Sequence, residues 1–171
     1  PDNQAVPIDG LCAGNGSTIQ MTQSQVNDYI NAYGVLSCIY MGGWKCWGNN
    51  TTAYPKSTEP NKRFIKCVLM GNYLENRFKA EHLVDIGRNA TLKLIRAVVT
   101  ETNAEFNALT PDYLAGAEIV FDSADNPLSE LLEGHLHFKT RYADYTPIEF
   151  IENSFTWDGT ILEDALREED E

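Results

Sequence analysis

The sequence predicts an α+β fold, in which helices pack against a mostly antiparallel sheet. Apolar side chains recur every three or four positions across residues 70–84 and 89–109, which is the period of an amphipathic helix. The period then switches to two across residues 114–122 and 135–143, which is the period of a half-buried strand. Long helices followed by alternating strands are typical of this class rather than of a parallel α/β sheet.

The first third of the chain predicts one helix and two short strands. Thr22 and Gln25 form a capping-box pattern, so we expect a helix over residues 24–33 that Gly34 ends. The apolar, glycine-bounded run 35–41 predicts a buried strand. Two glycines then allow a tight turn into a second extended run, residues 44–47.

The middle of the chain predicts a loop and two long helices. Residues 51–62 are rich in Pro, Ser, Thr and Asn and form the loop. Residues 64–69 predict a strand or an approach to the next helix. That helix spans 70–84 despite Gly71, and the helix over 89–109 is stopped by Pro111.

The last third predicts strands separated by a short helix. Residues 126–134 have Pro127 near the start and Gly134 past the end, as one or two helical turns require. Residues 147–157 are expected to form a third late strand, and its opening Pro147 favours an edge position.

Composition limits the classes of partner. The formal net charge of −12 argues against direct binding to nucleic acid, which depends on Lys and Arg. Acidic residues concentrate in segment 158–171, which is interpreted as a solvated acidic tail. No long apolar run predicts a membrane span, and the N-terminus does not have the pattern of a signal peptide. A chain of 171 residues is expected to form one domain.

Four cysteines leave the redox state open. Cys12, Cys38, Cys46 and Cys67 contain no C-x-x-C pair, which argues against a structural zinc site. Buried free thiols are typical of a reducing cytosol, whereas disulfides are typical of a particle that ends up outside the cell.

No set of residues predicts catalysis, a cofactor or a metal. His135 and His137 could share a strand face and bind a metal if His82 or Asp122 joined them, but a polar strand face is the simpler interpretation. No serine nucleophile elbow or phosphate-binding loop occurs. We therefore expect a protein that is not an enzyme and has no cofactor.

Two tryptophans beside a polar loop allow two interpretations. Trp44, Trp47, Gly48 and Asn49 precede further Asn and Thr residues, and flat aromatic rings beside amides suit a carbohydrate- or ligand-binding module. The alternative is a structural corner in which the rings pack inward.

The ordered motifs resemble the C-terminal domain of contractile tail sheath proteins of phages and phage-like bacteriocins. The similarity runs from "IDGLC" through "GGWKCWGNNTTAYP" and "LKLIRAVVTETNAEFNALTPDYLAGAEIVFD" to "NPLSELLEGHLHFKTRYADYTPIEFIENSF". It implies a tube-proximal domain over residues 1–157, a structural corner at Trp44, Trp47, Gly48 and Asn49, and an outer N-terminal domain that lies outside this chain. In this family Asn50 stands where a basic residue is common.

The resemblance also implies partners and a location. Sheath subunits form stacked hexameric rings around an inner tube protein and end at baseplate and tail terminator proteins. The implied location is the virion tail or an extracellular bacteriocin particle, assembled in the bacterial cytoplasm. Some cysteines are then expected to pair within or between subunits once the particle meets an oxidising medium.

Extended terminal arms of such sheaths add strands to neighbouring subunits. In this chain, residues 147–157 carry apolar groups on both faces of a strand, and a free edge of that kind favours pairing with another chain. An ordinary strand within the same chain is the alternative. The expected intersubunit strand consists of Ile148, Glu149, Phe150, Ile151, Glu152, Asn153, Ser154 and Phe155.

Overall fold

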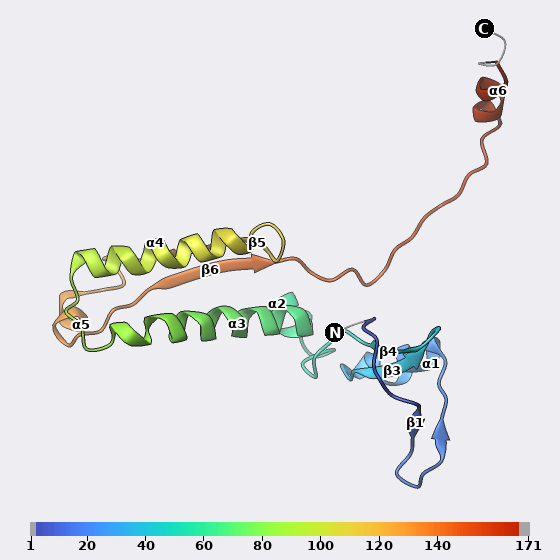
Figure 1. The fold of residues 1–171 in the computed structure, drawn as a ribbon, viewed down its shortest axis with the longest axis horizontal. Helices are drawn as coiled ribbons and strands as arrows, with labels where there is room; N and C mark the ends of the chain where they lie inside the picture. Colours follow the sequence, from blue (N-terminus) through green and yellow to red (C-terminus); the bar gives the residue numbers. More distant parts are fainter. Residues whose placement is uncertain (1–2, 168–171) are drawn as a thin grey trace.

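The computed structural model describes residues 3–167, and its body is built around two long helices and one hairpin (Figure 1). Helices α3 (Ile65–His82) and α4 (Leu92–Leu109) lie beside the hairpin of β5 (Leu114–Val120) and β6 (Lys139–Asp144). The remaining elements are β1 (Leu11–Cys12), β2 (Thr18–Ile19), α1 (Gln23–Tyr29), η1 (Asn31–Tyr33), β3 (Ser37–Tyr40), β4 (Trp44–Trp47), α2 (Pro60–Arg63), η2 (Leu83–Asp85), α5 (Leu128–Leu132) and α6 (Gly159–Arg167). The fold is α+β, as predicted.

Every strand pair among the described residues is antiparallel and belongs to a two-stranded sheet. The main core lies where α3, α4 and the β5–β6 hairpin meet, at Leu74, Phe106, Leu114 and Ile119. Leu114 and Ile119 are 0% and 1% exposed, so β5 is the strand that anchors the hairpin to the helices. Among residues 3–167, no helix has the length and apolar character needed to cross a bilayer.

The first helix is shorter than expected, although its cap is confirmed. The Thr22 and Gln25 side chains each bond the other's backbone N–H, and α1 then passes into η1 before Gly34. Gly34 has φ +71°, and a side chain there would collide with the Thr51 carbonyl. The run 35–41 forms only the short strand β3, in which Ile39 alone is buried, so the expectation of a buried strand is wrong for its neighbours.

Residues 64–69 do not form a strand. Phe64 is the N-cap of α3, and Ile65 already begins that helix. Cys67 and Leu74 are both buried and lie two helical turns apart, so the same helix face continues through this run. Gly71 is tolerated inside α3 because it leaves room for the Tyr142 hydroxyl of β6.

The late strands also differ from expectation. β6 begins at Lys139 rather than at His135, because the Asn126 side chain forms hydrogen bonds with both backbone groups of His137. Asn126 donates from Nδ2 to the His137 carbonyl at 2.9 Å and accepts from the His137 N–H at 2.7 Å. Five of the six β6 residues are exposed, so this strand is not half-buried in the single chain.

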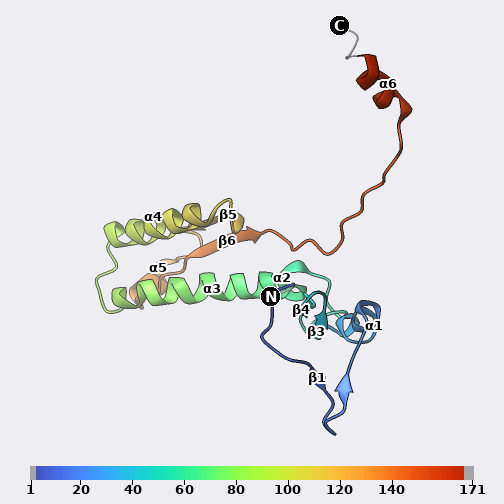
Figure 2. The same ribbon diagram turned by 45° about the vertical axis from the view of Figure 1, so that its right-hand side comes forward.

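The segment 147–157 forms no strand in this chain, contrary to the expectation of a third late strand. It leaves the end of β6 as an extended arm and leads to α6, which stands away from the body (Figures 1 and 2). Helix α6 occupies most of the segment interpreted as an acidic tail, and residues 168–171 lie outside the described part. We refer to residues 147–157 as the arm.

Candidate intersubunit interface

The two outer edges of the β5–β6 hairpin are unlike each other. On the β5 side, the Asn103 side chain of α4 donates to the Ile119 carbonyl and accepts from the Ile119 N–H, both at 3.0 Å. Those Ile119 groups point away from β6, so the partner residue Thr140 also turns its backbone groups away from β5. An amide side chain therefore occupies the place of a third strand at β5.

The β6 edge has no such cover in the described residues. Thr140 and, by alternation, Tyr142 direct backbone N–H and C=O groups outward, and no further strand lies along them. Unpaired groups of this kind invite the addition of a strand.

The hairpin is also too narrow to cover both long helices. Two strands lie about 4.8 Å apart, whereas packed helices lie about 8–10 Å apart. Helix α4 packs on β5, and between α3 and β6 there remains a groove of about 430 Å³. Its lining includes apolar side chains from both sides, namely Val68, Leu74, Phe78, Phe106 and Phe138, together with Thr140 and Tyr142.

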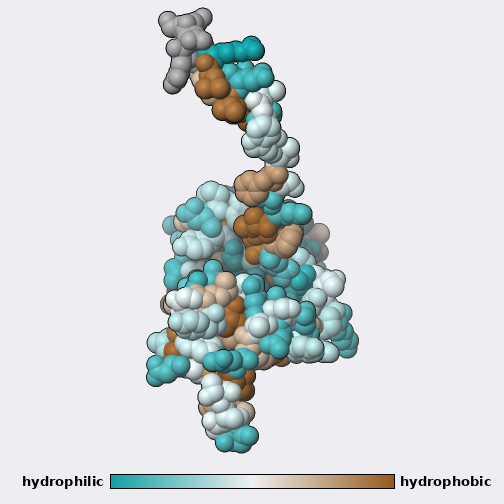
Figure 3. All heavy atoms as spheres, turned by 90° about the vertical axis from the view of Figure 1, so that its right-hand side faces the viewer, coloured by the Kyte–Doolittle hydropathy of each residue, from teal (hydrophilic) through white to brown (hydrophobic). Residues whose placement is uncertain are grey.

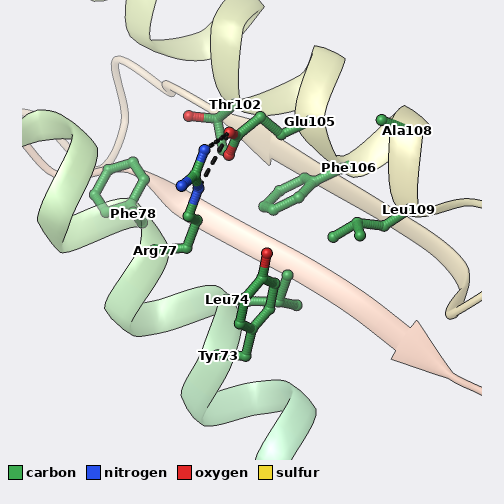
Figure 4. A pocket seen from close by; sticks show the side chains of 9 residues that line it. All are labelled: Tyr73, Leu74, Arg77, Phe78, Thr102, Glu105, Phe106, Ala108 and Leu109. Atoms are coloured by element: carbon green, nitrogen blue, oxygen red, sulfur yellow. Dashed lines mark hydrogen bonds and ion pairs between the residues drawn. The ribbon is translucent and has the colours of Figure 1, made fainter.

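A smaller pocket of about 160 Å³ lies between α3 and α4, and the ion pair between Arg77 and Glu105 joins the two helices there (Figure 4). Arg77 donates from Nη2 to Glu105 Oε1 at 2.8 Å and also pairs with Glu81. The bond from Arg77 lowers the pKa of Glu105, while a hydrogen bond with Glu105 raises the pKa of Glu81. The Arg77 side chain of α3 and the Glu105 side chain of α4 both line the pocket, so their ion pair braces the two helices.

The arm exposes large apolar side chains. Phe150 is 79% exposed, Ile151 80%, Phe155 91% and Trp157 84%. Figure 3 shows hydrophobic residues along this projection, in line with an amphipathic α6 at its end. Burial of one such side chain would stabilise the protein by about 1.5–3 kcal/mol, and this free energy is not gained while the side chain stays in water. The single chain therefore leaves the apolar surface of the arm unburied.

Arg63 holds the root of the arm against the body. Its Nη2 donates to Glu149 Oε2 at 2.6 Å, and its Nε donates to Asn50 Oδ1 at 2.7 Å. The guanidinium also lies 4.6 Å from the centre of the Tyr54 ring and 4.7 Å from that of Phe64. Thus Asn50, in the turn after β4, accepts a hydrogen bond from a basic side chain of α2.

The tryptophan segment forms β4 and the turn after it. Trp47 donates from Nε1 to Asn27 Oδ1 of α1 at 2.7 Å, and Trp44 packs edge-on against Tyr40 of β3. Gly48 and Asn49 are buried, and Asn49 accepts from the Ile65 N–H at the start of α3. A cavity of about 530 Å³ lies beside Trp47, and its lining includes Glu149 and Phe150 of the arm.

The structure separates the four cysteines. Cys38 and Cys46 are opposite one another in the β3–β4 hairpin, whereas Cys12 is exposed in β1. Cys67 is 1% exposed, and burial, with a hydrogen bond to Asp144, raises its pKa to about 11.

The histidines do not converge as the sequence pattern allows. His82, at the end of α3, lies with Nδ1 3.1 Å from Asp85 Oδ2 and with Nε2 3.1 Å from Thr102 Oγ1 of α4. Among residues 3–167, the potential ligands that gather are Glu130, Glu133 and His135, all exposed. His137, His82 and Asp122 are not members of this group.

Two candidate functional residues, Arg63 and Asn103, were not predicted from the sequence. Arg63 lies between the predicted loop 51–62 and the run 64–69, and Asn103 lies on the polar side of the helix predicted over 89–109. Arg63 bonds a partner 86 residues away, and Asn103 bonds a partner 16 residues away. The periodicity of apolar residues cannot predict such distant contacts. The available signals are a basic residue shortly after a proline at a helix start, and an amide beside the apolar face of an amphipathic helix.

No protein-family model matches the chain. It is 29% identical over 127 residues, 74% of its length, to the tail sheath protein of Escherichia phage P2. It is 29% identical over 153 residues, 86% of its length, to the tail sheath protein of Burkholderia phage BcepMu. These alignments cover 30% and 31% of the two relatives, so the chain spans about a third of their length.

Solved structures share the fold at low identity. The chain superposes on a protein in the cryo-EM structure of the anti-feeding prophage baseplate with TM-score 0.76 and 17% identity, covering 92% of this chain and 44% of that one. For the contracted helical sheath of the same prophage the TM-score is 0.69 with 19% identity and coverage of 82% and 41%. For the contracted sheath of the extracellular contractile injection system PVC the values are 0.69, 17%, 84% and 42%.

Proposed function

We propose that this chain, which belongs to the contractile tail sheath family, is a structural subunit of a contractile sheath. Its copies polymerise as stacked hexameric rings around an inner tube protein, and contraction drives the tube through the host envelope. Baseplate and terminator proteins bind the ends of the sheath. The chain acts in a virion tail or extracellular particle after assembly in the bacterial cytoplasm, and its role is mechanical rather than catalytic.

One observation carries the assembly mechanism. The chain exposes an apolar arm without a strand partner, and it also exposes the β6 edge beside an apolar groove under α3. The β5 edge is capped by Asn103, so β6 is the edge that remains for an added strand. We infer that residues 148–155 of one copy pair with β6 of a neighbour, while alternate arm side chains fill the groove.

The position of Arg63 supports a defined exit for the arm. The Arg63–Glu149 ion pair is partly shielded, with the two side chains 22% and 39% exposed. It ties the Glu149 side chain to its own subunit and so sets the direction in which the arm leaves the body toward a neighbour. A linker fixed at its root and paired at its tip suits a hinge that persists while whole subunits move during contraction.

The corner residues then have a supporting role. The Trp47–Asn27 bond and the buried Asn49 join α1, β4 and the start of α3. We assign Trp44, Trp47, Gly48 and Asn49 to a structural corner that positions Arg63 and the arm root, in preference to a carbohydrate-binding face.

The experiment is an assembly assay on the protein that contains this chain. We compare the intact protein with one truncated after Thr146, and with a control truncated after Arg167, by negative-stain microscopy and sedimentation. The intact protein and the control are expected to form tubes, and the truncation after Thr146 is expected to remain dispersed. Tubes formed without the arm would contradict the proposal. A dispersed intact protein that binds oligosaccharide would favour the binding module.

A further inference from the structure

Strand β4 is bordered on both sides, and its two edges are bonded differently. On one side it pairs with β3, and on the other it pairs with the N-terminal segment, through a bridge between Ala5 and Lys45. The Cys46 N–H donates to the Gln4 carbonyl at 2.8 Å, and the Asn3 N–H donates to the Cys46 carbonyl at 2.8 Å. Both backbone groups of Cys46 are therefore turned away from β3.

This orientation fixes the kind of pair that Cys46 makes with Cys38. The two residues are direct partners in the antiparallel register, and a residue bonded on one edge forms a non-hydrogen-bonded pair on the other. In such a pair the Cα atoms approach to about 4.5 Å and the side chains lie closest together. A disulfide needs Cα atoms about 4.4–6.8 Å apart, so the backbone already meets this condition.

The surroundings distinguish this pair from the other thiols. Cys38 and Cys46 are both partly exposed, so a small oxidant can reach them. Burial raises the pKa of Cys38, and the adjoining Cys46 thiol adds to the shift, which agrees with contact between the two side chains. Cys67 is enclosed in α3, and Cys12 lies in a separate hairpin.

We propose that Cys38 and Cys46 form a cross-strand disulfide by exchange with a small-molecule disulfide, of which oxidised glutathione is the probe. One protein thiolate attacks a glutathione sulfur, which forms a mixed disulfide and releases one glutathione thiol. The second protein thiolate then attacks the protein-bound sulfur and releases the second glutathione. The two cysteines lose two electrons and two protons, and one oxidised glutathione becomes two reduced molecules.

The bond would fix the register of β3 and β4. The N-terminal segment pairs with β4, and Trp47 of β4 holds α1, so the oxidised hairpin keeps these contacts in place. The exposure of a released particle to an oxidising medium rests on the proposed function. The pairing of these two thiols does not, because it follows from the register alone.

The test maps the bond in the purified protein. The protein is treated with oxidised glutathione at mildly alkaline pH, its free thiols are alkylated, and it is digested with trypsin and analysed by mass spectrometry. Cleavage after Lys45 separates the two cysteines, because Cys38 and Cys12 fall on one peptide and Cys46 falls on the next. Cys12→Ser and Cys38→Ser are the matched variants, and circular dichroism checks that each is folded.

We expect the Cys46 peptide to be linked to its neighbour in the wild type and in Cys12→Ser, and to be unlinked in Cys38→Ser. An alkylated or glutathione-capped Cys46 in the oxidised wild type would overturn the proposal, as would a link that requires Cys12. Microscopy of the same samples separates this result from the proposed function, since a linked protein that never forms tubes refutes only the latter.

Discussion

The arm residue Phe155 offers a direct measure of strand donation. Phe155 is 91% exposed in the single chain, so replacing it should change the free energy of unfolding by less than about 0.5 kcal/mol. If a neighbour buries the ring, the Phe155→Ala change removes about 1.5–3 kcal/mol from each intersubunit contact. Since about 1.4 kcal/mol corresponds to a tenfold change in affinity, the concentration needed for assembly should rise roughly 10- to 150-fold.

A graded series makes this prediction specific to burial. Phe155→Leu keeps most of the apolar area and should have the smallest effect, Phe155→Ala an intermediate one, and Phe155→Asp the largest. Sedimentation over a concentration series measures assembly, and thermal unfolding of the unassembled protein measures stability. Leu132→Ala, at a 78% exposed position on α5, is the control outside the arm. A large drop in the melting temperature of Phe155→Ala, or an unchanged assembly threshold, would refute burial of this ring by a neighbour.

Three further changes test the arm root, the β5 cap and the buried thiol. Arg63→Lys keeps the charge but cannot bond both Asn50 and Glu149, so electron microscopy should show fewer or irregular tubes while the melting temperature changes little. Asn103→Ala leaves the buried Ile119 backbone without partners and should destabilise the protein by about 1–3 kcal/mol in urea unfolding. The Cys67 pKa of about 11 is raised by folding, so its stabilising contribution is complete below about pH 9 and is lost as the pH rises through about 11. Urea midpoints over this range should fall more steeply for the wild type than for Cys67→Ala.

Opposite outcomes would be informative for each. Regular tubes from the Arg63→Lys protein would mean that the arm root needs no fork-shaped donor. A neutral Asn103→Ala change would mean that water replaces the amide at the β5 edge. Parallel pH profiles for the wild type and Cys67→Ala would show that other groups cause any alkaline loss of stability.

Local signals predicted the elements whose determinants lie within a few residues. Thr22 and Gln25 predicted the cap of α1, and the regular spacing of apolar residues predicted α4, because both features depend on neighbours one turn away. The prediction of a strand at residues 64–69 failed because a short apolar run has the same composition in a strand and in a buried helix face. Only the continuation of that face to Leu74 separates the two.

Elements controlled by distant partners could not be predicted. The late start of β6 depends on Asn126, which bonds the His137 backbone across an intervening helix. The arm illustrates the same limit on a larger scale, since its alternating apolar residues predict a strand but do not say which chain supplies the partner. Its isolated form is extended and exposed, which is the expected state of a strand whose partner is absent.

The most direct test of the account is a cryo-EM map of the assembled particle, resolved well enough to trace the arm. We predict that residues 148–155 run along the outer edge of β6 in a neighbouring copy, with arm side chains in the groove beside α3. An arm that lies along its own β6, or that remains in solvent within the intact sheath, would contradict the account.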